Sequence, residues 1–151
     1  MYRWHARPGA FQRLTPPWAP VELLGHEGIE DGDRAELRLG PAPLGIRWIA
    51  EHEEHRPGRG FRDRQVRGPF ARWLHTHRFE PTGEASSRLV DEISYALPGG
   101  RLGHLLAEPR LRNELTRQFA YRHRITRSDL ELHERYAPSE DRWTVAVSGA
   151  S

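Results

Sequence analysis

The sequence predicts an α+β fold in which a curved antiparallel sheet wraps around a long C-terminal helix. Before residue 98, short stretches of alternating apolar and polar residues are separated by proline- and glycine-rich turns, as in an antiparallel meander. After Pro98-Gly99-Gly100 the apolar residues recur at helical spacing. A long amphipathic helix that follows a sheet must bury its apolar side on one sheet face. This arrangement commonly leaves a cavity between the helix and the sheet.

The segment before the sheet is expected to contain little regular structure. Residues 1–14 predict two short helical pieces that are broken by Pro8-Gly9, and Pro16-Pro17 then forces an extended turn. Glycine and proline punctuation separates the runs that follow. These runs predict six strands, at residues 21–24, 35–39, 44–53, 61–66, 71–80 and 88–97.

Alternation within the strands predicts which side chains share a face, because successive side chains point to opposite sides of a sheet. The fifth strand is the clearest case. It places Trp73, His75, His77 and Phe79 together. The third strand places Ile46, Trp48 and Ala50 on one face, and the sixth places Leu89, Asp91, Ile93, Tyr95 and Leu97 on one face.

The helix is expected to exceed twenty residues and to carry one apolar stripe. The stripe consists of Leu102, Leu105, Leu106, Leu111, Leu115 and Phe119. Pro109 either kinks the helix or begins its second segment. The solvent side is predicted to carry Arg110, Arg112, Arg117 and Arg122, and residues 121–124 are interpreted as the C-terminal end of the helix.

Composition excludes several classes of chemistry. The chain has 151 residues, about one domain, and only 36% are hydrophobic, so its core must rely on large aromatic side chains. It contains neither Cys nor Lys. Disulfides, thiol nucleophiles, Schiff-base lysines and P-loop lysines are therefore excluded. No apolar run reaches the roughly 20 residues that span a bilayer, and no secretory signal begins the chain, so we expect a cytoplasmic protein with no membrane partner.

The charge pattern does not favour a nucleic-acid partner. The net charge is only +2, because 23 basic residues alternate with 21 acidic ones. The densest basic run extends from Arg56 to Arg72, but Asp63 interrupts it and strand alternation divides its members between two faces. A solvated sheet face explains this run better.

Two histidines and two carboxylates form the strongest chemical constellation. His75 and His77 share a strand face, and Asp63 and Asp91 lie on the preceding and following strands. The four residues can satisfy one another or the polar end of a ligand. They can also support acid-base catalysis or a metal ion. We favour the first interpretation and predict no metal and no cofactor in this chain.

The other histidines do not suggest a site. His52 and His55 are three residues apart in a predicted strand end, whereas a zincin motif needs a four-residue spacing on a helix. The remaining histidines are predicted to lie at the surface or at caps: His5, His26, His104, His123 and His133.

A ligand pocket is predicted where the sheet and the helix face each other, because pockets combine apolar walls with a few polar groups. Its predicted apolar lining is Trp48, Phe61, Trp73, Phe79, Ile93, Tyr95, Leu111, Leu115 and Phe119. Its predicted polar lining is Asp63, His75, His77 and Asp91.

Several segments together resemble a known family. They are WHARPGAFQRLTPPW (residues 4–18), FRDRQVRGPFARWLHTHRFEP (61–81), LVDEISYALPGG (89–100) and FAYRHR (119–124). They resemble a START-like domain of the SRPBCC superfamily. More narrowly, they resemble the subfamily fused N-terminally to NAD-dependent epimerase-like proteins, sometimes labelled cell-division inhibitors.

The resemblance implies a helix-grip fold and binding of a small hydrophobic or amphipathic ligand. A standalone cyclase or dehydratase that uses His75, His77 and Asp63 or Asp91 is the alternative. A third interpretation is a structural remnant that folds poorly.

The resemblance also implies a domain division. Residues 1–132 correspond to the ligand-binding domain, whose first strand is missing, and residues 133–141 to a linker. Residues 142–151 resemble the start of a truncated dinucleotide-binding domain, because a short apolar strand at 144–147 runs into Ser148-Gly149. No nucleotide site can exist in this chain. We therefore expect NAD(P) only in a downstream domain, with which this one would make contact.

Overall fold

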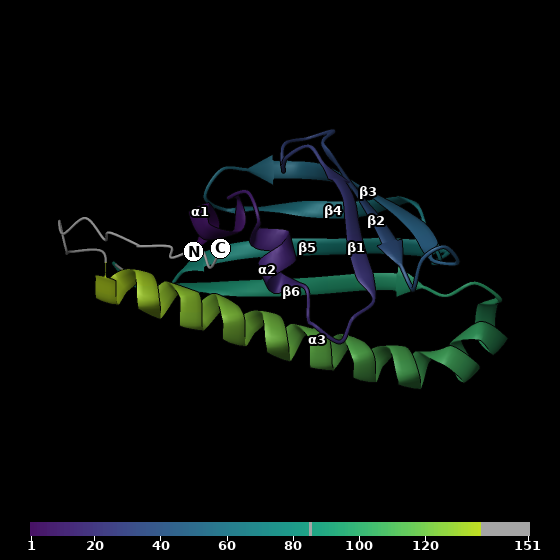
Figure 1. Cartoon of the computed structure of the whole chain (residues 1–151). Coiled ribbons are helices and arrows are strands. Elements are labelled where there is room, and N and C mark those ends of the chain that lie inside the picture. Colours follow the sequence, from purple (N-terminus) through teal and green to yellow (C-terminus); the bar gives the residue numbers. More distant parts are fainter. Residues whose placement is uncertain (85, 137–151) are drawn as a thin grey trace, which may run out of the picture.

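The computed structural model describes residues 1–84 and 86–136 (Figure 1). In this part of the chain, two short helices precede a six-stranded sheet and one long helix follows it. The helices are α1 (Tyr2–His5), α2 (Ala10–Leu14) and α3 (Gly100–Tyr136). The strands are β1 (Val21–His26), β2 (Arg34–Leu39), β3 (Ile46–Arg56), β4 (Gly60–Arg67), β5 (Arg72–Pro81) and β6 (Ser87–Ala96).

The sheet is an antiparallel meander in the order β1-β2-β3-β4-β5-β6. Each strand pairs with the next one in the sequence, as the short turns predict. The ladders shift register between Leu23 and Gly25 of β1 and at two places in β3. Such irregularities bend strands and increase their twist, which suits a curved sheet. The predicted α+β helix-grip fold class is confirmed.

Alternation along β5 agrees with the prediction. Trp73, His75, His77 and Phe79 are buried. Arg72 and Arg78, on the other face, are exposed.

The outer face of the sheet carries ion pairs between neighbouring strands. Two guanidiniums, those of Arg34 and Arg64, each lie 2.8 Å from the carboxylate of Glu51. Arg64 belongs to the basic run that we interpreted as a solvated sheet face. Cross-strand pairs of this kind stabilise a sheet only modestly. The ion pairs on this face therefore help to set how neighbouring strands align, whereas the core lies on the other face.

Helix α3 has 37 residues and runs alongside the sheet, next to β6 in Figure 1. The prediction that an apolar stripe of this helix is buried against the sheet is wrong for its first two turns. Leu102, Leu105 and Leu106 are 65%, 74% and 74% exposed. Pro109 lies inside the helix, and Figure 1 shows the first turns at an angle to the rest. A proline removes a helical hydrogen bond and bends the axis, so these turns lie beyond the sheet face that buries the later ones.

Two further predictions about α3 need correction. The helix does not end at residues 121–124 but continues to Tyr136, so residues 133–136 belong to the helix rather than to a linker. The strand predicted at 144–147 and the rest of the predicted dinucleotide-binding start lie outside the described residues. Among the helices that the structure describes, none combines the length and apolar character needed to cross a membrane.

An ion-pair cluster attaches the N-terminal helices to the far end of α3. Asp129 on α3 is buried, and its carboxylate accepts hydrogen bonds from Arg13 at 2.8 and 3.1 Å. Arg7, between α1 and α2, approaches the same carboxylate at 3.4 Å. The hydrogen bonds from Arg13 hold the pKa of Asp129 below its usual range. Because α2 and α3 both border the space above the sheet, this cluster helps to fix the walls of that space.

We predict that Asp129→Asn lowers the free energy of unfolding at pH 7 by about 1 kcal/mol, because the partly exposed arginines lose a charged partner. The difference between the two proteins should disappear as the pH falls through the lowered folded-state pKa of Asp129, where the wild-type carboxylate becomes neutral. Urea unfolding at several pH values measures both effects. Glu131→Gln, an exposed carboxylate on the same helix, is the control and should change stability by less than about 0.5 kcal/mol. Equal stability of Asp129→Asn and wild type at pH 7 would contradict the role of the cluster.

Candidate functional site

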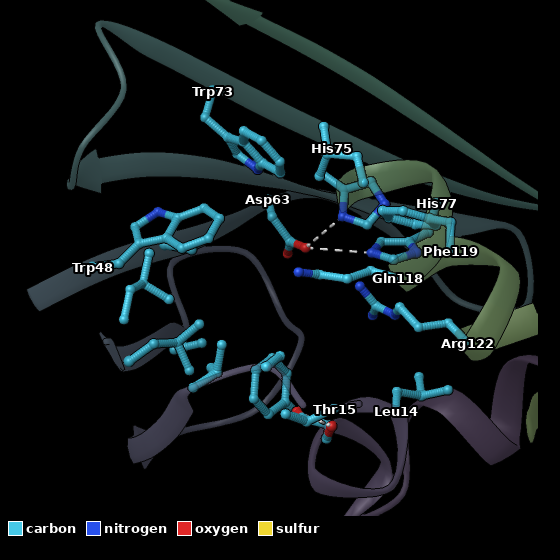
Figure 2. A pocket seen from close by; sticks show the side chains of 18 of the residues that line it. Leu14, Thr15, Trp48, Asp63, Trp73, His75, His77, Gln118, Phe119 and Arg122 are labelled. Carbon is cyan, nitrogen blue, oxygen red and sulfur yellow. Dashed lines mark hydrogen bonds and ion pairs between the residues drawn. The ribbon is translucent and has the colours of Figure 1, made fainter. Parts of the chain in front are cut away.

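A cavity of about 320 Å³ lies between the inner face of the sheet, the segment around α2 and the middle of α3 (Figure 2). Most of its wall is apolar. From α3 it is lined by Leu111, Leu115 and Phe119. From the N-terminal segment it is lined by residues that include Ala10, Phe11 and Leu14. The volume lies at the lower end of the range of about 300–1,000 Å³ that is typical of small-molecule sites.

Aromatic rings form one end of the cavity. Trp48 on β3 and Trp73 on β5 meet edge to face with their ring centroids 5.1 Å apart. Phe70, in the turn before β5, packs on Trp73 at 4.7 Å. Contacts of this kind prefer defined geometries, so they give this end of the cavity a fixed shape suited to a flat apolar group.

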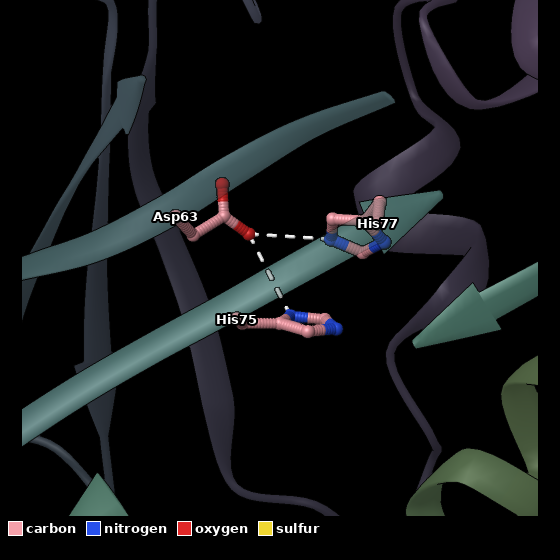
Figure 3. Close-up of side chains that lie close together, drawn as sticks. All are labelled: Asp63, His75 and His77. Carbon is pink, nitrogen blue, oxygen red and sulfur yellow. Dashed lines mark hydrogen bonds and ion pairs between the residues drawn. The ribbon is translucent and has the colours of Figure 1, made fainter. Parts of the chain in front are cut away.

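Strand register assembles a polar cluster at the other end. His52 on β3, Asp63 on β4 and His75 on β5 are directly opposite one another in neighbouring ladders. His52 Nδ1 lies 2.5 Å from Asp63 Oδ1. His77 Nε2 lies 3.3 Å from Asp63 Oδ2, and His75 Nδ1 lies 3.6 Å from the same oxygen (Figure 3).

A second carboxylate lies on the opposite side of the two β5 imidazoles. Asp91 on β6 is opposite His77 in the ladder. Its Oδ1 lies 3.1 Å from His75 Nε2 and 2.8 Å from His77 Nδ1. Its Oδ2 lies 2.7 Å from His123 Nε2 on α3. Each β5 imidazole is therefore held between two carboxylates. We call these six residues the His-Asp cluster: His52, Asp63, His75, His77, Asp91 and His123.

The position of His77 also depends on a glycine. Gly60, at the start of β4, lies so close to β5 that a Cβ on it would come within 2.1 Å of the His77 carbonyl oxygen. No other residue type permits this approach without moving the backbone that carries His77.

Burial and pairing set the protonation of the cluster. Burial alone would raise the pKa of both carboxyls, but hydrogen bonds from histidines reverse this effect and hold the pKa of Asp63 and Asp91 far below the usual range. Burial lowers the pKa of His75 to about 4, and the positive charge of His77 adds to this effect. For His77, burial lowers the pKa, but its pairing with both carboxylates outweighs burial and raises it. Pairing therefore favours the imidazolium form of His77, and burial favours the neutral form of His75.

The protonation of His75 fixes its tautomer. A neutral His75 that donates from Nε2 to Asp91 has no proton on Nδ1. That unprotonated nitrogen faces Asp63, which lines the cavity. One oxygen of Asp63 and one nitrogen from each of His75 and His77 lie within 4.8 Å of one another, so these three residues are also the candidate metal ligands in the described part of the chain.

The side chain of Arg122 on α3 lines the cavity. The prediction that Arg122 faces solvent is therefore wrong. Figure 2 shows its side chain directed inward with that of Asp63. Its guanidinium packs 5.1 Å from the centroid of the Phe119 ring. Among the described residues it forms no hydrogen bond or ion pair. Burial lowers its pKa from the usual value. Arg122 is therefore a cation in the cavity without a direct counter-ion.

The structure brings together nine of the thirteen residues predicted to line the pocket. These are Trp48, Phe61, Asp63, Trp73, His75, His77, Leu111, Leu115 and Phe119. The other four, Phe79, Asp91, Ile93 and Tyr95, do not line it. Phe79 packs against Tyr2 and His5 instead, and Asp91 lies behind the β5 imidazoles.

Several lining residues were missed by the sequence analysis. Three further histidines line the cavity: His5, His26 and His52. His5 and His26 are predicted to lie at the surface or at caps, and the sequence analysis assigns His52 to no site because its spacing to His55 does not fit a zincin motif. Burial lowers the pKa of His5 to about 4. His123, also predicted to lack a constellation, contacts Asp91. His52 was detectable in principle, because it lies opposite Asp63 once the β3–β4 register is known.

Comparisons with known proteins agree with this architecture. The family model described as "Polyketide cyclase / dehydrase and lipid transport" matches residues 1–120, and the chain belongs to this family. This match confirms the superfamily-level resemblance. The chain is also similar to the crystal structure of TTHA0849 from Thermus thermophilus, with 22% identity and a TM-score of 0.56. That alignment covers 91% of this chain and 89% of the other, and it supports the fold. No curated protein matches the chain.

We predict that in chelator-treated protein at pH 6 to 7, His77 carries two ring protons and His75 carries one. Histidine-labelled ¹⁵N NMR distinguishes the two forms. Since the folded-state pKa of His75 is about 4, its contribution to stability should fall as the pH drops from about 6.5 toward 4. The contribution of His77, whose pKa is raised, has the opposite sign and is lost as the pH rises through its folded-state pKa. The variant His77→Gln should raise the pKa of His75, and His133→Gln should not. A charged His75 beside a neutral His77 would contradict this assignment.

Proposed function

We propose that this chain binds a small amphipathic molecule whose apolar body fills the cavity and whose acidic group pairs with Arg122. The observation that carries the proposal is the guanidinium of Arg122, which lies in a largely apolar cavity without a direct counter-ion among the described residues. A charge taken from water is costly unless a partner compensates it. A carboxylate or sulfonate of a ligand would supply that partner, and planar bidentate recognition of such groups suits arginine.

The shape of the cavity supports a compact ligand. The aromatic end, with Trp48, Phe70 and Trp73, favours a flat ring system. The volume of about 320 Å³ suits a molecule of one or two rings better than a long acyl chain. The family description mentions both cyclase/dehydrase and lipid transport members, and the cavity size favours the smaller kind of ligand.

The proposal also includes a molecular context. We infer that the chain is the N-terminal part of an NAD-dependent epimerase-like protein, in which NAD(P) binds only to the downstream domain and that domain contacts this one. The inference rests on the resemblance of residues 4–18 and 142–151 to that subfamily. The DNA that flanks the gene decides it: an in-frame downstream glycine-rich segment supports the fusion, and stop codons on both sides without a frameshift contradict it.

The His-Asp cluster supports a second candidate function, a cyclase or dehydratase. The Nδ1 atom of His75 lies 3.6 Å from Asp63 Oδ2, both residues line the cavity, and Asp91 orients the ring through its hydrogen bond with Nε2. An imidazole oriented by a carboxylate is a suitable general base for removing a proton next to a carbonyl. His77, between the same two carboxylates, is the corresponding acid.

We predict that the wild-type protein binds 2-naphthoate about 10- to 100-fold more tightly than neutral 2-naphthamide, because only the acid pairs with Arg122. Arg122→Met should remove this preference and leave amide binding nearly unchanged. Fluorescence titration measures both affinities. Arg124→Met is the matched control, since Arg124 is an exposed arginine on the same helix. Equal affinities of the wild type for acid and amide would contradict the role of Arg122, and no binding of either compound would contradict the cavity proposal itself.

For the catalytic candidate, the expected reaction is proton exchange at the methyl group of 2-acetylnaphthalene in D₂O, followed by ¹H NMR. The double variant His75→Gln, His77→Gln should abolish exchange above the buffer rate, whereas His133→Gln should retain it. Naphthoate binding by the double variant shows whether the cavity is intact. Exchange by the double variant at the wild-type rate would rule the catalytic candidate out while leaving the binding function untouched.

A further inference from the structure

We propose that Asp63, His75 and His77 bind a divalent first-row transition-metal ion such as Zn²⁺ or Fe²⁺ at the polar end of the cavity. This site shares no residue with the proposed contact to an acidic ligand, because its donors lie on the sheet and do not include Arg122. Two imidazoles and one carboxylate form a donor set that such ions accept, in zinc enzymes and in iron sites that keep positions open for other molecules.

The donor atoms already have suitable spacing. Asp63 Oδ2 lies 3.3 Å from His77 Nε2 and 3.6 Å from His75 Nδ1 (Figure 3). Ligands placed about 2.0–2.2 Å from a common ion in a tetrahedral arrangement are separated by about 3.3–3.6 Å. All three atoms lie within 4.8 Å of one another, so an ion can reach them by side-chain adjustment without a change in strand register.

The groups behind the donors match the surroundings of metal ligands. A metal-bound imidazole usually donates its other N–H to a carboxylate, which fixes its tautomer and orientation. Here the second nitrogens of both imidazoles face the same atom, Asp91 Oδ1, at 3.1 Å for His75 and 2.8 Å for His77. The oxygen of Asp63 that does not face these imidazoles lies 2.5 Å from His52 Nδ1.

Hydrogen bonding within the protein leaves this group incompletely satisfied. His52 Nδ1 and Nε2, Asp63 Oδ1 and His77 Nδ1 are all buried, and none forms a hydrogen bond of good geometry with the described residues. These four atoms surround the three proposed ligand atoms and are not ligands themselves, so they show that the polar network beside the site is imperfectly hydrogen-bonded. A divalent ion would also compensate two buried carboxylates at once.

The side of the site away from Asp91 opens onto the cavity. Asp63, His75 and His77 all line it, together with Arg122. Three protein ligands leave at least one position of the ion for water or for an oxygen atom of a bound molecule. The metal would therefore face the molecule in the cavity rather than serve as a closed structural site.

The test uses chelator-treated full-length protein and metal alone. We expect one equivalent of Zn²⁺ to bind in calorimetry and one equivalent of Co²⁺ to give visible absorption typical of a low-coordinate N/O site. His77→Gln and Asp63→Asn should each weaken Zn²⁺ binding by at least about 100-fold. Asp91→Asn, which changes no ligand, should weaken it by about 10- to 100-fold. His26→Gln, a cavity histidine outside the ligand set, should bind as the wild type does.

Circular dichroism establishes that each variant is folded. If a ligand variant does not fold, X-ray absorption of the Zn²⁺-loaded wild type decides the question, because two imidazoles and one carboxylate give a recognisable scattering pattern. No saturable Zn²⁺ binding by the folded wild type would overturn the proposal, as would a Zn²⁺ affinity that the ligand variants leave unchanged. Naphthoate binding in chelator is measured separately, so failure of the metal site and failure of the ligand proposal give different results.

Discussion

Two buried carboxylates impose the constraint on which the interior of this protein depends. The side chains of Asp63 and Asp91 are only 18% and 6% exposed, yet both remain ionised. Uncompensated charges at such positions would cost several kcal/mol each. Imidazoles from β3, β5 and α3 meet this requirement. Since His123 contributes from the helix and the others from the sheet, charge pairing joins the two layers at the point where the cavity is polar.

Strand register produces this pairing. Asp63 faces His75 and His52 directly, whereas His77 reaches it diagonally from the same strand as His75. A shift of one residue between β4 and β5 would turn Asp63 to the outer face of the sheet. His75 and His77 would then remain on the inner face without Asp63 as a charged partner. The ion pairs on the outer face, such as Arg64 with Glu51, oppose the same shift. The two faces of the sheet therefore specify one register by different means.

Much of the fold could be predicted from the sequence, because the two-residue period of a strand and the 3.6-residue period of a helix can each be read from a short stretch of neighbouring residues. Two-residue alternation located all six strands, and the change after Gly100 located the helix. Apolar spacing alone could not show that the first turns of α3 extend past the sheet. Where the helix bends and where the sheet beneath it ends depend on how the two pack together, and residue spacing does not record this. The same limit explains Arg122, because an arginine at a cavity wall has the sequence pattern of a solvent-facing one. His52 required the β3–β4 pairing, in which register shifts prevent simple counting.

Charge balance links the two ends of the cavity. In the described structure, the cation of Arg122 offsets part of the negative charge of Asp63 and Asp91 through space, and the pairing of His77 with both carboxylates adds to this effect. An acidic ligand on Arg122 would remove that offset and make the polar end more negative. A divalent ion at Asp63, His75 and His77 would reduce that negative charge, because it brings two charges where a proton brings one. The acidic ligand and the metal would then each strengthen the binding of the other, even though no residue contacts both. The arrangement of charge thus provides a physical reason for one small cavity to contain both a cluster rich in imidazoles and an unpaired arginine.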